Sequence, residues 1–244
     1  MYHILATSAF FSAYVQSDFF GKMIFWVLYF LSIVSWVLII SRWRLFRKLN
    51  RINHQISSVF DKHKENTLGM TLPGHFYSTH PYLVIYRELK QQAIDVLKKN
   101  TFFMKEHEKS EVYLATADIE MIGSYLQSVI ALQTKKLGKN LFILSMTSKL
   151  APFFGLLGTV WGILTTFSNL QTHSLSSGNT AILGGLAMAL GTTVVGLIVA
   201  IPSLIGYHYL KNATYDATEE MDHFAHSLIN RIEMQYRNVE KVMK

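Results

Sequence analysis

The stretch that decides the fold is LAPFFGLLGTVWGILTTF, which runs from Leu150 to Phe167 and contains no charged residue. Two other stretches are similarly apolar, Met23 to Ile40 and the longer Ala181 to Leu210. A bilayer core about 30 Å thick needs roughly 20 apolar residues of helix. We therefore predict three membrane-spanning helices.

The composition supports a membrane protein. Half of the 244 residues are apolar and only 16% are charged, which is too few for an ordinary soluble surface. The chain has no cysteine, so neither a disulfide nor a cysteine-ligated metal site can form. The net charge of +7 is compatible with nucleic-acid binding or with a membrane protein that has basic cytoplasmic segments.

The positions of Lys and Arg favour the membrane explanation. Residues 42–149 hold 17 of them and the tail from Lys211 holds five, whereas residues 1–21 and 168–180 hold none. Because basic segments stay in the cytoplasm, we predict a periplasmic N-terminus and a cytoplasmic C-terminus, and no nucleic-acid partner.

We predict an all-α membrane protein whose three long transmembrane helices extend into a cytoplasmic helical domain. The predicted segments are a periplasmic N-terminus (1–22), a first span (23–41), a cytoplasmic helical region (42–147), a second span (148–169), a periplasmic loop (170–180), a third span (181–210) and a cytoplasmic helical tail (211–244). The basic residues directly after the first span indicate a stop-transfer segment rather than a cleaved signal peptide.

Within the cytoplasmic region, the pattern predicts that the first helix continues from Arg42 to about Phe60. Glycines and prolines mark Asn66 to Pro81 as a loop, and a helix follows to about Asn100. Apolar residues at steps of three and four between Val112 and Val129 predict an amphipathic helix.

Small residues recur at helical steps in the second and third spans. They are Gly155, Gly158 and Gly162 in the second span, and Gly185 and Gly196 in the third. Small residues on one helix face allow two helices to approach closely inside a membrane, so we predict that these glycines pack helices together.

Of the hydroxyl residues in the second and third spans, we single out Thr159 and Thr193, because each lies mid-span in otherwise apolar surroundings. They either bond to carbonyls of their own helix or line a polar path for water or protons. No Asp or Glu occurs between Glu120 and Asp216. If this chain conducts protons, a partner helix must therefore supply the carboxylate that relays them.

The segments APFFGLLGTVWGI (Ala151 to Ile163) and ALGTTVVGLIVAIP (Ala189 to Pro202) resemble the TolQ/ExbB/MotA proton-channel family. LSIVSWVLIISR (Leu31 to Arg42) and the short N-terminus are more similar to TolQ than to ExbB. The resemblance implies a ring of subunits, typically a pentamer, around helices of a TolR- or ExbD-like partner whose single membrane Asp carries the proton. It also implies that Thr159 and Thr193 line the proton pathway.

The same resemblance implies a function in the bacterial inner membrane. Proton flow would drive the partner, which does work on a TolA-like protein that spans the periplasm and maintains the envelope during cell division. The alternatives are an ExbB-type energiser of nutrient uptake through a TonB-like protein, and a scaffold that holds a partner helix without conducting.

This sequence departs from the family pattern at two positions. Met188 stands where the family often has Glu, and Lys149 stands where small or apolar residues are usual. We interpret Lys149 as an interfacial anchor whose ammonium extends to the cytoplasmic headgroups.

An enzyme is not expected, and we predict no catalytic residue, cofactor or metal. Gly138-Lys139 is followed by Asn140 and lacks the upstream glycine of a nucleotide-binding loop. Asp222, His223 and His226 have the residue types of a metal site, but a solvated helix face is the better interpretation.

The predicted topology can be tested with an epitope tag inserted near Gly69. The tag should be inaccessible to reagents added to the periplasm and accessible after the inner membrane is permeabilised. A tag that is labelled from the periplasm would contradict the topology.

Overall fold

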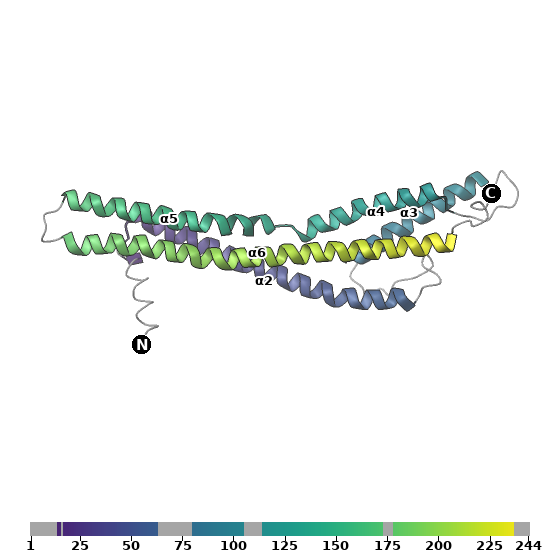
Figure 1. Cartoon of the computed structure of the whole chain (residues 1–244), viewed down its shortest axis with the longest axis horizontal. Coiled ribbons are helices and arrows are strands. Elements are labelled where there is room, and N and C mark those ends of the chain that lie inside the picture. Colours follow the sequence, from purple (N-terminus) through teal and green to yellow (C-terminus); the bar gives the residue numbers. More distant parts are fainter. Residues whose placement is uncertain (1–13, 16, 63–79, 105–113, 173–177, 237–244) are drawn as a thin grey trace. The chain divides into compact units, whose positions relative to one another are not determined.

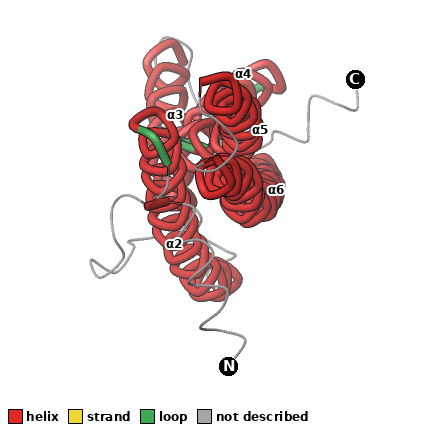
Figure 2. The backbone as a smooth tube through the Cα atoms, turned by 90° about the vertical axis from the view of Figure 1, so that its left-hand side faces the viewer, coloured by secondary structure: helices red, strands yellow, loops and turns green. Residues whose placement is uncertain are grey.

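The chain is all-helical where it is described. The computed structural model describes residues 14–15, 17–62, 80–104, 114–172 and 178–236. Its helices are α2 (Phe19–Lys62), α3 (Pro81–Met104), α4 (Thr116–Leu137), α5 (Leu141–Thr172) and α6 (Gly178–Tyr236), and short loops join some of them (Figure 2). Residues 66–79 of the predicted loop at 66–81, residues 173–177 of the predicted periplasmic loop at 170–180 and residues 237–244 of the predicted tail helix lie outside the described residues. Residues 170–172 of the predicted periplasmic loop belong to α5, and residues 178–180 belong to α6.

The chain divides into two compact units. The first, called the membrane unit, consists of residues 1–43 and 140–211. The second, called the polar unit, consists of residues 44–139 and 212–244. Helices α2 and α6 each contribute one part to each unit, because both continue without a break beyond their apolar segments.

Three helices are long and apolar enough to cross a membrane, as the sequence predicts. The candidate spans are Phe19–Asn53, Leu141–Gln171 and Ile182–Tyr236, although their apolar parts are shorter than these ranges. Helix α5 begins at Leu141, earlier than the predicted start of the second span at residue 148. Lys149 therefore lies inside this helix, after Thr147 and Ser148 and before the apolar stretch that begins at Leu150.

In the membrane unit, α2 packs on α5 and α6 through an apolar cluster. The cluster consists of Ile24 and Leu28 of α2, Ala151 of α5, and Val199 and Ala200 of α6. Ser35 of α2 and Ser203 of α6 share a buried hydrogen bond of 2.6 Å. A hydrogen bond between two serines satisfies both hydroxyls where water is absent and holds the two helices in register.

Glycines form the contact between α5 and α6, which we call the glycine seam. The seam consists of Gly155, Gly158, Gly162, Gly185 and Gly196. A Cβ atom added to Gly162 would lie 2.7 Å from the Gly185 carbonyl oxygen, and one added to Gly196 would lie 2.7 Å from the Ala151 carbonyl oxygen. Real Cβ atoms do not approach backbone this closely. The two helices run side by side at a separation that only residues without a side chain allow (Figure 1).

The core of the polar unit is formed by leucines and isoleucines from all of its helices. Ile56 of α2, Leu89 of α3, Leu126 of α4 and Leu228 of α6 are each at most 1% exposed. The predicted amphipathic helix corresponds to α4, in which Leu126 is joined on the buried face by Val129 and other members of the predicted pattern. Val112 lies outside the described residues.

Glu220 connects three helices of the polar unit. Its carboxylate on α6 accepts a 2.8 Å hydrogen bond from the Asn53 amide of α2 and a 3.2 Å hydrogen bond from the Tyr82 hydroxyl of α3. Burial and the neighbouring Glu220 charge both raise the pKa of Tyr82. Tyr82 therefore remains a neutral hydrogen-bond donor at physiological pH.

The glycine seam predicts a contrast between two Gly→Ala substitutions. A Cβ atom at Gly158 would overlap the Thr192 side chain, whereas one at Gly123 of α4 would meet only Ile229, at 3.8 Å. Gly158→Ala should destabilise the protein by about 1–3 kcal/mol, as overpacking does. Gly123→Ala should be neutral or stabilising by up to about 1 kcal/mol, because alanine favours helix. Thermal unfolding of both full-length variants in the same detergent measures the difference, and equal stability would argue against the seam.

Candidate functional site

The structure brings Thr159 and Thr193 to neighbouring positions on the α5–α6 pair. The Thr159 hydroxyl of α5 donates a 2.7 Å hydrogen bond to the Leu156 carbonyl of its own helix. The Thr193 hydroxyl of α6 donates a 3.2 Å hydrogen bond across the seam to the Gly155 carbonyl. Because Gly155 and Leu156 are consecutive, the two hydroxyls are held within one turn of α5. Both side chains are half-buried.

A third hydroxyl, that of Thr192, is sealed inside the seam. Thr192 has no exposed surface, and its hydroxyl lies 2.9 Å from the Ala189 carbonyl and 3.4 Å from the Gly155 carbonyl. The sequence analysis did not single out Thr192. Its side chain occupies the space that Gly158 leaves open, so its role is packing.

Helix α2 covers the opposite side of the α5–α6 pair. Phe20 of α2 contacts Trp161 of α5, with ring centroids 4.5 Å apart. Thr159 precedes Trp161 by two residues, or about 200° around the helix, and so points away from α2. The same spacing separates Thr193 from Val195, which packs on the apolar cluster with α2.

The uncovered side is called the threonine face. It consists of Leu156, Thr159 and Ile163 of α5 and Leu190, Thr193 and Leu197 of α6, which recur at steps of three and four. The four apolar residues are between 45% and 68% exposed in the single chain. Each threonine hydroxyl has already donated its proton and retains lone pairs, so the face offers hydrogen-bond acceptors in apolar surroundings.

The membrane unit has one carboxylate, Asp18, which the sequence reasoning overlooked. Its two oxygens accept a 2.9 Å hydrogen bond from the Gly21 amide and a 2.7 Å hydrogen bond from the Trp161 indole. An acidic residue immediately before an apolar helical segment is the signal of an N-cap, and it was available in the sequence. Asp18 lies on the α2 side of α5, away from the threonine face.

Met188, which replaces the acidic residue often found at this position, is also turned away from the threonine face. It is 2% exposed, and its sulfur lies against Gly21 of α2. An apolar side chain at this position packs α6 against α2 and adds no charge to the threonine face.

Lys149 is exposed and lies on α5 between Ser148 and Leu150, and its role as an interfacial anchor stays a prediction. Gly206 of α6 packs against both Ile39 of α2 and Leu144 of α5, so these residues share one level. Lys149 is five residues beyond Leu144, and Arg42 is three residues from Ile39 in the opposite direction. At 1.5 Å per residue, Lys149 is about 12 Å from the level of Arg42.

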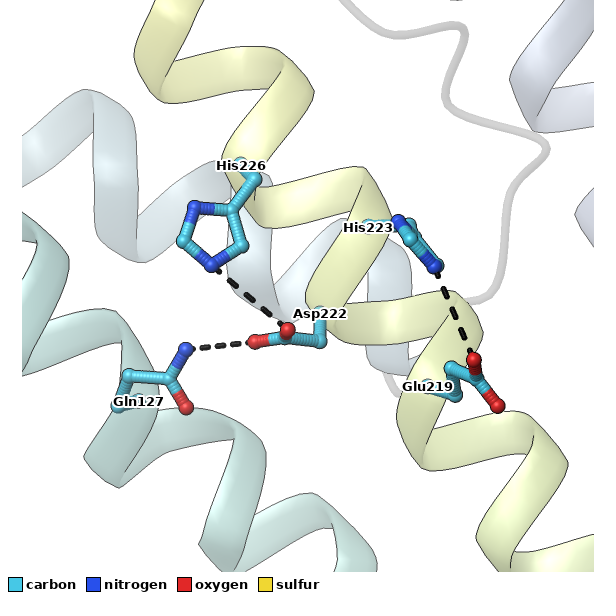
Figure 3. Close-up of polar contacts among 5 residues, drawn as sticks. All are labelled: Gln127, Glu219, Asp222, His223 and His226. Atoms are coloured by element: carbon cyan, nitrogen blue, oxygen red, sulfur yellow. Dashed lines mark hydrogen bonds and ion pairs between the residues drawn. The ribbon is translucent and has the colours of Figure 1, made fainter.

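The polar residues Asp222, His223 and His226 do not converge on one point. Asp222 accepts a hydrogen bond from Gln127 of α4 and lies 3.6 Å from His226, whereas His223 pairs separately with Glu219 at 3.9 Å (Figure 3). Among the described residues, no group of three or more His, Cys, Asp or Glu is arranged to hold a metal ion. These contacts are pairs on the surface of the polar unit.

Comparison with known proteins identifies the family. Residues 95–223, more than half of the chain, match the MotA/TolQ/ExbB proton channel family. The chain is 26% identical over 210 residues to the biopolymer transport protein ExbB of Neisseria meningitidis serogroup A, which covers 86% of this chain and 90% of that protein.

Two shorter matches have higher identity. ExbB of Aquifex aeolicus is 47% identical over 76 residues, covering 31% of this chain and 51% of that protein. The Tol-Pal system protein TolQ of Pseudomonas aeruginosa is 35% identical over 92 residues, covering 38% of this chain and 39% of that protein. The family match, the three apolar helices and the glycine seam agree with the resemblance seen in the sequence, and the chain belongs to the MotA/TolQ/ExbB proton channel family.

Proposed function

We propose that this protein is the channel subunit of an inner-membrane motor that couples the proton motive force to work in the periplasm. The observation that carries the proposal is the threonine face, where two hydroxyls lie at consecutive carbonyls of α5 on a surface without a carboxylate. A face that offers hydrogen-bond acceptors but no titratable acid suits the binding of a partner helix that brings the acid.

Energy estimates agree with the proposal that this chain supplies the hydroxyl groups and a partner helix supplies the acid. A proton that crosses 100 mV releases about 2.3 kcal/mol, and an Asp in the bilayer centre costs about 2.5–3.5 kcal/mol on insertion scales. A partner Asp therefore needs polar, enclosed surroundings. When it is protonated, its hydroxyl would donate a hydrogen bond to the Thr159 or Thr193 oxygen, which offsets part of this cost.

The proposed assembly is a ring of identical chains, with five as the expected number. The threonine faces would point inward around a TolR- or ExbD-like partner, and α2 would lie on the outside against lipid. The proposed orientation has the N-terminus in the periplasm and the polar unit in the cytoplasm, as the distribution of Lys and Arg favours.

Two processes are candidates for the work that the motor performs. The first span (Leu31 to Arg42) resembles TolQ, which favours coupling to a TolA-like protein and a role in envelope integrity and cell division. The match over most of the chain to a protein named ExbB favours the second candidate, coupling to a TonB-like protein in nutrient uptake. We propose the TolQ-type role first and the ExbB-type role as the alternative.

The double substitution Thr159→Val and Thr193→Val tests proton conduction. It keeps the branched shape of both side chains and removes both hydroxyls. The loss of one hydrogen bond from a protonated partner Asp, worth about 1 kcal/mol, should slow proton flux roughly fivefold in vesicles that contain the chain and its partner.

Thr165→Val is the matched control for the threonine test. Its hydroxyl bonds only to carbonyls of its own helix, those of Trp161 and Gly162, and it lies off the threonine face. The control should conduct like the unmodified chain. Full flux in the double variant would instead favour a scaffold that does not conduct.

Complementation distinguishes the two processes. The chain, expressed with its own single-span partner, should restore detergent resistance in a bacterial strain that lacks TolQ. It should restore growth on TonB-dependent iron sources in a strain that lacks ExbB only if the alternative is correct. Rescue of iron uptake alone would reject the TolQ-type role.

A further inference from the structure

His80 is a buried histidine of the polar unit whose ring has no hydrogen-bond partner among the described residues. It is 5% exposed, and neither Nδ1 nor Nε2 makes a hydrogen bond. In the part of the chain that the structure describes, no other buried side-chain nitrogen or oxygen lacks a partner. A buried polar group without a partner costs free energy, so its presence needs a physical explanation.

The residue stands at the start of α3. The His80 carbonyl accepts 3.0 Å hydrogen bonds from the Leu83 and Val84 amides of the first turn. The His80 ring meets the Tyr82 ring edge-on, with centroids 5.7 Å apart. Tyr82 in turn stacks on Phe224 of α6, with centroids 4.5 Å apart. The buried imidazole is therefore part of the packing that holds the first turn of α3 on α6.

The surroundings of the imidazole disfavour its protonated form. Burial has the largest effect and lowers the pKa of His80, whereas the nearby Leu49 carbonyl of α2 raises this pKa by less. That carbonyl favours a positive charge on the ring but does not form a hydrogen bond with either nitrogen. The first turn of α3 is also the positive end of the helix dipole, which opposes a cation there.

The charged groups of the neighbouring helices do not compensate for these effects. On α3, the side chain that faces the ring is Tyr82, which is neutral at physiological pH. On α6, the Glu220 carboxylate is bonded to the Tyr82 hydroxyl. On α2, the charged residues next to the carbonyl are Lys48 and Arg51, which are exposed and basic. Among the described residues, His80 forms no ion pair.

We propose that His80 is a pH-sensitive latch for the polar unit. While its ring is neutral, the ring stays buried and helps to pack the start of α3 on α2 and α6. When the ring takes up a proton, its charge is more stable in water than in this buried position, so the start of α3 is released.

The direction of the pH effect follows from proton linkage. The released state binds a proton at the ordinary histidine pKa of about 6.5, whereas the latched state binds one only at a lower pH. Well above pH 6.5 the ring is neutral in both states, and the latch has its full stability. As the pH falls below 6.5, the released state gains up to about tenfold for each pH unit, until the pH reaches the lowered pKa of the latched state.

The latch would make the polar unit sensitive to proton flow. If the polar unit lies in the cytoplasm, as the proposed function has it, conducted protons are released on its side of the membrane. Acidification there would loosen the start of α3, so the polar unit would respond to the pH that the channel itself produces. This consequence rests on the proposed function, whereas the latch itself depends only on the packing of the polar unit.

Hydrogen–deuterium exchange of the full-length chain in detergent tests the latch. Exchange is measured at pH 7.5 and 5.5 and corrected for the pH dependence of the intrinsic exchange rate, and α4 in the same sample is the internal reference. In the unmodified chain, the opening constant of the first turns of α3 should rise roughly fivefold to tenfold at pH 5.5. The opening constant of α4 should change by less than about twofold, because its buried face carries no histidine.

Substitutions of His80 separate its titration from other effects of acid. His80→Phe keeps an aromatic ring, His80→Gln keeps a polar side chain, and neither new side chain titrates. Both variants should lose the pH dependence at the start of α3. His223→Gln is the matched control, because His223 is exposed and pairs with Glu219 on the surface of the same unit. This control should keep the full pH dependence.

Three results would overturn the latch. The first is equal protection of the start of α3 at both pH values in the unmodified chain, a result that needs no variant. The second is a pH dependence that persists in the His80 variants, and the third is equal loosening of α3 and α4.

The measurement uses the purified chain without a partner or a proton gradient, so it is independent of proton flux. A chain that conducts protons but shows no pH-dependent opening of α3 rejects the latch and leaves the proposed function standing. A chain that shows the opening but does not conduct rejects the proposed function and leaves the latch standing.

Discussion

The close approach of α5 and α6 is the constraint on which the membrane unit depends. Glycines let the two backbones touch, and the contact is fixed because a Cβ atom at Gly162 or Gly196 would collide with a carbonyl oxygen. Without this approach the Thr193 hydroxyl could not reach the Gly155 carbonyl on the neighbouring helix. The glycines of the seam, which have no side chain, therefore determine where the threonine hydroxyls lie.

The position of α2 decides which side of this pair remains available. Its apolar cluster, the Ser35–Ser203 hydrogen bond and the Asp18–Trp161 hydrogen bond all lie on one side of α5 and α6. The one acid of the membrane unit is thus engaged where α2 begins. The threonine face lies on the other side and keeps its hydroxyl acceptors and its exposed leucines for a second helix.

The charge distribution along α5 completes this picture. The stripe that carries Thr159 also carries the exposed Lys149 and contains no acidic residue. The second and third spans contain no acidic residue, and α5 contains the basic Lys149. Both describe a surface that suits a helix bearing a carboxylate.

The sequence by itself determined the three spans, their helical character, the family and the small residues that pack α5 on α6. These follow from hydrophobic length, from periodicity and from motifs, which are local along the chain. The glycine spacing predicted a packing face because residues three and four apart share one side of a helix.

Only the tertiary structure decided which sides of the helices meet, since this depends on contacts between residues far apart in the sequence, from 38 positions for Gly155 and Thr193 to 168 positions for Ser35 and Ser203. It buried Thr192 in the seam while leaving Thr159 and Thr193 on the open face. It joined Asp18 to Trp161 and turned Met188 towards α2.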